Sequence, residues 1–189
     1  MSTVEDLKNR APQGFGVTVE TLTPTDQDIR VLSAQGRTVR DVIEIPARCV
    51  CGNPLVAATA PRLSNGSPFP TVFYLAHPAI TAAASRLEAG GLMYEMTDAL
   101  AADTELASRY TLAHENYLAE RERIRLISGT DEVPEIENIS AGGMPTRVKC
   151  LHALLGHSLA AGAGVNPIGD RTLEALRERG LWDPERCSC

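Results

Sequence analysis

Apolar residues recur at intervals of three and four along the chain after residue 78, and this spacing constrains the fold more than any other feature. It predicts a helix that begins at Pro78 and ends at Gly90-Gly91, then a second helix, and then a longer one capped by Asp103. The apolar positions of the first helix are Ile80, Ala83, Ala84 and Leu87. Most of the chain after residue 78 is therefore expected to form packed helices.

Two further helices are expected near the C-terminus. One covers about Cys150 to Ala161 and the other is a short helix over residues 173–176. Residues 128–146 are rich in Gly, Pro, Ser and acidic residues, which is typical of an exposed loop.

The chain before residue 78 has the pattern of strands. Residues 39–45, 55–59 and 71–76 are β-branched or apolar runs separated by turn residues, so they predict about three strands in a small antiparallel sheet. A short helix after Thr25 precedes them, and residues 1–24 are polar and predict a flexible tail. The predicted fold class is α+β: a mostly helical single domain over residues 25–189 with the sheet in its N-terminal half.

Composition narrows the class of protein. The chain has 189 residues, 43% hydrophobic and 22% charged, with a formal net charge of −6. A negative chain is a poor match for broad nucleic-acid binding, which needs a basic face. The N-terminus lacks a secretory signal pattern, and no stretch approaches the roughly 18 apolar residues of a membrane span. We therefore expect a cytoplasmic protein without membrane association, whose five cysteines are thiols or metal ligands rather than disulfides.

The segment Arg147 to His152 has the highest density of reactive and charged side chains. It places a thiol, an imidazole and two cations at a predicted helix start, where the helix dipole and the basic neighbours favour a thiolate at Cys150. That thiolate can be a metal ligand or a nucleophile, with His152 as acid or base, or the segment can cradle an anion. His157 lies roughly 140° around the helix from His152, so one of the two histidines is expected to be structural.

Thiols and imidazoles also occur in three other segments. A Cys-x-Cys pair, Cys49 and Cys51, lies between two predicted strands; His77 precedes Pro78; and a second such pair, Cys187 and Cys189, ends the chain. Zinc takes four ligands from Cys, His and carboxylate, so four separate segments supply enough. A buried cysteine beside an incidental one explains the first pair equally well.

These motifs, taken in order, resemble the DUF501 family, an uncharacterised bacterial family found mainly in actinobacteria. The residues that carry the resemblance are Arg48-Cys49 with Gly52 and Pro54, Gly66 to Thr71, Ser85 to Glu88, Val148 to Ala153, and Asn166 to Gly169. The likeness extends from about residue 25 to the C-terminus, and the family name implies no activity.

The resemblance implies a metal set. Relatives carry Cys at the position of His77 and a Cys near the C-terminal Trp, and a Cys-to-His exchange retains a zinc ligand. The implied zinc ligands are Cys49, His77, Cys150 and Cys187, with Cys189 as the alternative to Cys187. Cys51 matches no family position.

Three functions remain open from the sequence. The first is a zinc-binding protein whose structural Cys/His site supports a binding or interaction module. The second is an enzyme on an anionic, phosphorylated substrate, with Cys150 or His152 in the reaction. Its site would be lined by Glu88 and by an anion-binding set formed by Arg86, Arg147 and Lys149. The third is a scaffold whose partner surface includes Phe69, Pro70 and Trp182. The partner is accordingly a protein or a small anionic ligand.

Overall fold

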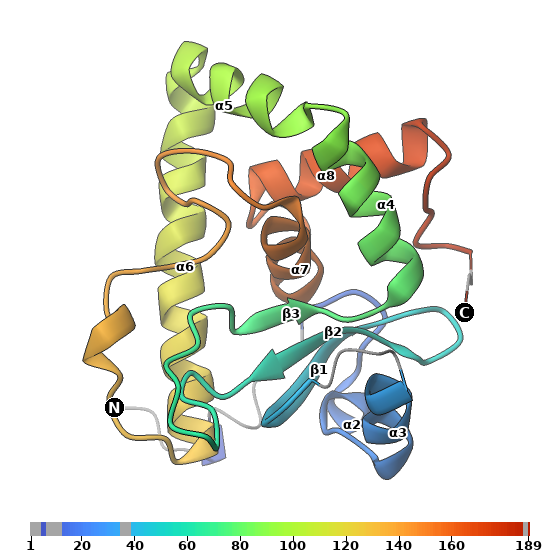
Figure 1. Ribbon diagram of the computed structural model, residues 1–189, viewed down its shortest axis with the longest axis vertical. Coiled ribbons are helices and arrows are strands. Elements are labelled where there is room, and N and C mark those ends of the chain that lie inside the picture. Colours follow the sequence, from blue (N-terminus) through green and yellow to red (C-terminus); the bar gives the residue numbers. More distant parts are fainter. Residues whose placement is uncertain (1–4, 7–12, 35–38, 187–188) are drawn as a thin grey trace.

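A three-stranded antiparallel sheet lies in the lower half of the molecule as drawn in Figure 1, and most of the helical layer lies above it. The computed structural model describes residues 5–6, 13–34, 39–186 and 189. The strands are β1 (Val42–Arg48), β2 (Pro54–Thr59) and β3 (Phe73–Leu75), in the order β1-β2-β3. The α+β prediction is confirmed.

β1 continues past the proline that was expected to end it. The sequence predicted a strand over residues 39–45, whereas β1 reaches Arg48. Pro46 has no N–H to donate, but β1 is an edge strand and its pairing register shifts between Glu44 and Ala47. This extension carries the chain to the turn that holds Cys49.

α7 (Leu151–Ala161) is the central helix of the fold and packs on β3 (Figure 1). It is buried along nearly its whole length, which explains its high content of Leu and Ala. Gly156 permits the close approach, because a Cβ there would lie 3.0 Å from the carbonyl oxygen of Phe73. The predicted bounds of this helix are correct within one residue.

The other helices surround α7. α4 (Pro78–Ala89) runs from the sheet to α5 (Leu92–Ala102), and α5 leads to the long α6 (Thr104–Ser128), whose N-cap Asp103 accepts from Leu106 N at 2.9 Å. α8 (Pro167–Glu178) packs against α7. It is longer than predicted, because Asn166 caps its N-terminus and Pro167 occupies the first turn.

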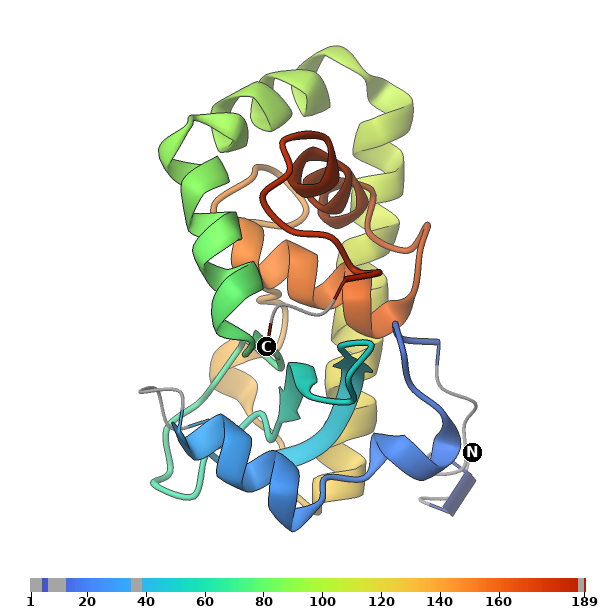
Figure 2. The same cartoon turned by 90° about the vertical axis from the view of Figure 1, so that its right-hand side faces the viewer.

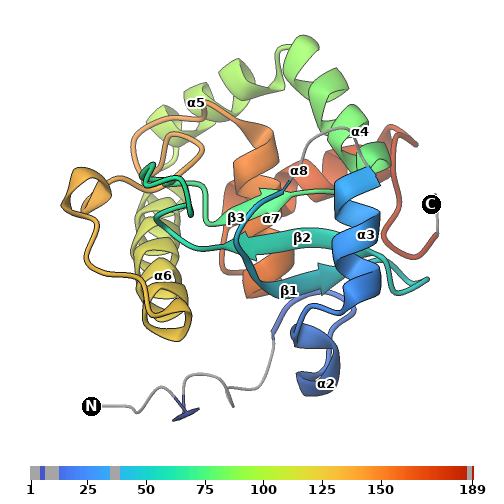
Figure 3. The same ribbon diagram turned by 60° about the horizontal axis from the view of Figure 1, so that its bottom comes forward.

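The opposite face of the sheet is also covered. α3 (Asp26–Ala34) lies across it (Figure 3), and Leu32 packs there with Ile45, Ala57 and Ala76. All of β2 is buried, which accounts for its continuous apolar sequence.

Part of the predicted tail and of the predicted exposed loop is packed. Residues 19–22 form the short helix α2 (Val19–Leu22), and Phe15 N donates to Leu159 O at 2.9 Å. In the segment 128–146, which includes the 3-10 turn η1 (Pro134–Ile136), Ile136, Ala141 and Met144 are buried. Within the described residues, no helix is long and apolar enough to cross a membrane.

Candidate metal centre

The turn between β1 and β2 positions two cysteines. Gly52 N donates to Cys49 O at 2.8 Å, and Cys49 N donates to Asn53 O at 2.8 Å, which closes a tight turn around Cys51. Gly52 has φ +91°, a conformation that side-chain-bearing residues rarely adopt. Cys49 is buried whereas Cys51 is exposed, so the turn presents one thiol from inside the fold and one from its surface.

Arg48 fixes this turn to the rest of the protein. Its guanidinium donates to both carboxylate oxygens of Asp28 in α3, at 2.6 and 2.9 Å, and also to Gly52 O at 2.8 Å. Burial alone would raise the pKa of Asp28, but hydrogen bonds from Arg48 and Thr25 outweigh it and hold the pKa at about 2. The buried ion pair therefore locks the turn in place before any ligand binds.

The C-terminal residue lies against the same turn. Cys189 Sγ is 3.1 Å from Cys51 Sγ, although the two residues are 138 positions apart in the chain. The sulfur atoms of Cys49, Cys51 and Cys189 all lie within 4.8 Å of one another. Figure 2 shows the C-terminus close to the start of α4.

His77 contributes a fourth polar atom. It is the buried N-cap of α4, and its Nε2 lies 3.0 Å from Cys189 Sγ. Burial lowers the pKa of His77, so the ring is neutral near pH 7. Its Nδ1 accepts from Ala79 N at 3.3 Å, which places the ring proton on Nε2, directed at the sulfur. To ligate a metal through Nε2, the ring has to give up its contact with Ala79.

The three sulfur atoms fit a zinc-type ion. Zinc–sulfur bonds of about 2.3 Å in a tetrahedron place two sulfur atoms about 3.8 Å apart. The measured Cys51–Cys189 separation is 3.1 Å, and the largest separation in the cluster is below 4.8 Å, so small side-chain movements suffice. Thiolates are soft ligands that favour zinc over magnesium or calcium.

Cys150 belongs to a second group of donor atoms. It is the N-cap of α7, and its Sγ lies 4.0 Å from His152 Nδ1. The same nitrogen is 3.0 Å from Glu88 Oε1 of α4. The hydrogen bond with Cys150 raises the pKa of His152 to about 9, against burial that lowers it, and Glu88 adds to the rise. The structure therefore separates Cys150 from the cysteines of the β1–β2 turn.

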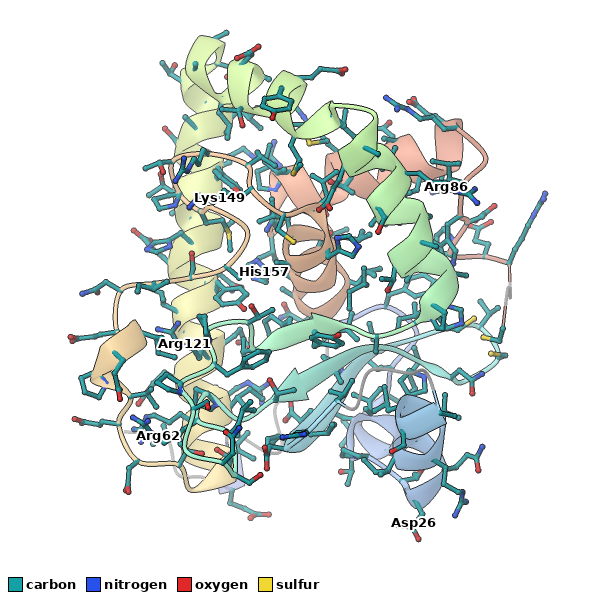
Figure 4. The ribbon with its side chains drawn as sticks, in the orientation of Figure 1. Asp26, Arg62, Arg86, Arg121, Lys149 and His157 are labelled. Atoms are coloured by element: carbon teal, nitrogen blue, oxygen red, sulfur yellow. The ribbon has the colours of Figure 1, made fainter. Side chains whose placement is uncertain are left out.

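Two of the three predicted anion-binding residues do not converge. Arg86 and Lys149 lie apart, on α4 and on the segment before α7 (Figure 4). The side chains of Arg86, Arg147 and Lys149 are all exposed.

His157 is a core residue. It is fully buried, its Nε2 lies 2.9 Å from Asn116 Oδ1, and its ring stacks on Phe73 at 5.7 Å. Burial lowers its pKa to about 3, so it packs as a neutral ring. Of the two histidines in α7, His157 is thus the structural one.

Of the clustered cysteines, sequence reasoning set aside Cys51 and named Cys189 only as the alternative to Cys187. Of the four implied ligands, Cys49 and His77 lie at the β1–β2 corner, Cys150 lies in the second group, and Cys187 falls outside the described residues. Cys51 and Cys189 complete the corner instead. The sequence pattern that could have identified Cys51 and Cys189 was the repeated Cys-x-Cys spacing. Trp182, expected on a partner surface, is buried.

These features define an α+β protein with a cluster of cysteines where its C-terminus meets a β-turn. The family model described as "Protein of unknown function (DUF501)" matches residues 45–174, which is more than half of the chain, so the protein belongs to the DUF501 family. The matched span contains Cys49, Cys51 and His77 but ends before Cys189. No curated protein and no solved structure matches the chain.

Proposed function

We propose that this protein binds one zinc ion at Cys49, Cys51 and Cys189 as a structural site, and that the zinc-stabilised fold serves as an interaction module. The observation that carries the proposal is the approach of three sulfur atoms, from the β1–β2 turn and the C-terminus, to within 4.8 Å. The reducing cytoplasm expected from the sequence is where such thiols act as metal ligands.

The fourth ligand comes from one of two residues. His77 Nε2 already lies 3.0 Å from Cys189 Sγ. Cys187 precedes Cys189 by two positions, and its role remains a prediction from the sequence. If Cys187 is the ligand, His77 keeps its proton on Nε2 and donates a hydrogen bond to the Cys189 sulfur, an outer contact of the kind that supports zinc sites.

A closed site of this kind acts through the fold. Four protein ligands leave no position for a substrate, so the ion stabilises structure. Here it joins the C-terminal segment to the β1–β2 turn across 138 residues of sequence. Zinc at 100 times its dissociation constant adds about 2.7 kcal/mol to the free energy of unfolding. The turn also presents Val50, whose side chain is 56% exposed between two ligands, as an apolar contact for a protein partner.

Metal analysis of ligand variants tests the site. We expect Cys51→Ser and Cys189→Ser each to lose one equivalent of zinc, measured by mass spectrometry of the purified full chain. Glu95→Gln, an exposed change on α5, is the control and should keep the zinc content of the wild type. Comparing His77→Gln with Cys187→Ser then identifies the fourth ligand.

Fluorescence supplies a second readout. Trp182 is the single tryptophan of the chain and lies seven positions before Cys189 in the C-terminal segment. Removing zinc with a chelator should change its emission in the wild type but not in Cys189→Ser. Equal zinc content in wild type, Cys51→Ser and Cys189→Ser would rule out the proposed site.

The placement of two of the predicted anion-binding residues argues against the alternative of an enzyme on a phosphorylated substrate. That function requires Arg86, Arg147 and Lys149 to line one pocket, whereas Arg86 and Lys149 lie apart (Figure 4). We therefore do not propose it. Its other two residues, Cys150 and His152, support a different inference.

A further inference from the structure

Three donor atoms of different chemistry face one another between α4 and α7. One donor atom from each of Glu88, Cys150 and His152 lies within 4.8 Å of the other two. The nitrogen–oxygen distance is 3.0 Å and the nitrogen–sulfur distance is 4.0 Å. Thiolate, imidazole and carboxylate are the three ligand types that zinc uses in proteins.

The surrounding contacts orient His152 for ligation through Nδ1. Its Nε2 lies 3.1 Å from the carbonyl oxygen of Thr81, which can only accept a hydrogen bond. Ser85 Oγ is also 3.1 Å away, and its own hydrogen is directed to Thr81 O at 3.0 Å, so it accepts as well. Nε2 therefore carries a proton, and Nδ1 is the nitrogen that faces Glu88 and Cys150. Histidines that bind a metal through one ring nitrogen commonly donate a hydrogen bond from the other ring nitrogen to a carbonyl oxygen.

Glu88 is held in place by the start of α7. Its Oε1 accepts from Leu151 N at 2.7 Å, one of the helix N–H groups that have no partner within the helix. All three side chains are about half-buried, which restricts their movement without closing them off from solvent. The site thus has both its donor atoms and the contacts that fix them.

The measured separations are close to those that a bound ion requires. Tetrahedral zinc places nitrogen and oxygen ligands about 3.4 Å apart, and sulfur and nitrogen about 3.6 Å apart. The corresponding distances here are 3.0 and 4.0 Å. Each pair needs to move by only about 0.4 Å, which side-chain rotation supplies.

We propose that Glu88, Cys150 and His152 bind a second zinc-type ion, with three protein ligands and a fourth position open to a small molecule. Cys150 and His152 line a cleft of about 720 Å³ whose walls include Phe73, Tyr74 and Leu75. That volume is within the usual range for small-molecule sites. The ligand of the open position is accordingly a small molecule with an oxygen donor on an apolar body. This inference does not depend on the structural site at the β1–β2 turn.

A metal-free ion pair is the competing explanation. Glu88 and protonated His152 would join α4 to α7, as their 3.0 Å contact allows, and Cys150 would then be a further hydrogen-bond partner of the ring rather than a metal ligand. The two explanations differ in what they require of Cys150. Replacing this thiol leaves the ion pair intact but removes a ligand from the metal site.

Cobalt(II) titration of the full chain separates them. We expect the wild type to bind two equivalents of cobalt. Cys150→Ser and Glu88→Gln should each bind one equivalent tightly and bind the second at least about 100-fold more weakly than the wild type does. Glu88→Gln keeps an oxygen that accepts from Leu151 N, so the start of α7 is preserved. Ser85→Ala should weaken the second equivalent about 10-fold, since it removes an outer contact of His152. Glu95→Gln, an exposed change on α5, is the control and should bind two.

The open position has its own readout. Acetohydroxamate should change the visible absorption of the second cobalt equivalent and leave that of the first unchanged. Retention of both equivalents by Cys150→Ser and Glu88→Gln would overturn the site. A second equivalent whose spectrum does not respond to acetohydroxamate would overturn the open position. If Cys51→Ser binds two equivalents of cobalt, the structural site at the β1–β2 turn is contradicted, whereas the site at Glu88, Cys150 and His152 is not.

Discussion

Replacing Asp28 with Asn tests whether the buried ion pair holds the cysteine turn in place. Arg48 and Asp28 have side chains only 7% and 6% exposed, and the guanidinium donates to both carboxylate oxygens. The substitution leaves the Arg48 charge buried without its counter-charge, a change that typically costs 3–5 kcal/mol, or roughly 3 kcal/mol if the Asn oxygen retains one hydrogen bond.

The pKa of Asp28 gives an independent estimate. It is about 2 in the folded protein, against 3.8 for an unperturbed aspartate. That difference corresponds to about 2 kcal/mol of stability. Because the folded pKa is the lower one, this contribution is present above pH 4 and is lost as the pH falls toward 2. Wild type and Asp28→Asn should therefore differ most at pH 7 and least near pH 2.

Urea unfolding at pH 7 and at low pH measures both effects. Asp26→Asn is the matched control, since Asp26 is exposed on the same helix (Figure 4) and should change stability by less than about 0.5 kcal/mol. Zinc binding should also weaken in Asp28→Asn, because Arg48 no longer fixes Gly52. Unfolding curves for Asp28→Asn that match the wild type at pH 7 would refute the reasoning.

Two further predictions concern the core around α7. Since burial lowers the pKa of His157 to about 3, its NMR signals should not titrate between pH 8 and 5. The contribution of His157 to stability should be full above pH 6.5 and fall as the pH drops toward 3, because in this range only the unfolded chain takes up the proton. A titration midpoint near pH 6.5 for His157 in the folded protein would contradict this. Gly169→Ala should lower stability by about 1–3 kcal/mol in thermal unfolding, since a Cβ there overlaps Leu154 O and Ser158 Cβ. Gly90→Ala, where the nearest atom is 3.3 Å away, is the control and should cost less than Gly169→Ala; equal losses would refute the packing argument.

The helices were predictable because local signals agree with the packing. Pro78 begins α4 and Asp103 caps α6, as the sequence predicted. The strands were harder to delimit, since Pro46 normally ends a strand and is tolerated here only because β1 lies at the edge of the sheet. Edge position is a property of the tertiary structure, which a local pattern does not contain.

The site was less predictable for the same reason. The sequence identified the segments that carry thiols and imidazoles, but not which of them meet in space. Cys51 and Cys189 are 138 residues apart and come together only because the C-terminal segment returns to the β1–β2 turn. Glu88 was expected to line one site with Cys150 and His152, but its approach to within ligand distance depends on the packing of α4 against α7, which no spacing in the sequence encodes.

X-ray absorption at the zinc edge is the most direct test of the structural site. The sample is Cys150→Ser protein carrying one equivalent of zinc, so that the site at Glu88 does not contribute. The account predicts a shell of three or four sulfur atoms at about 2.3 Å, with at most one nitrogen. A shell made mainly of nitrogen and oxygen, with fewer than three sulfur atoms, would contradict it.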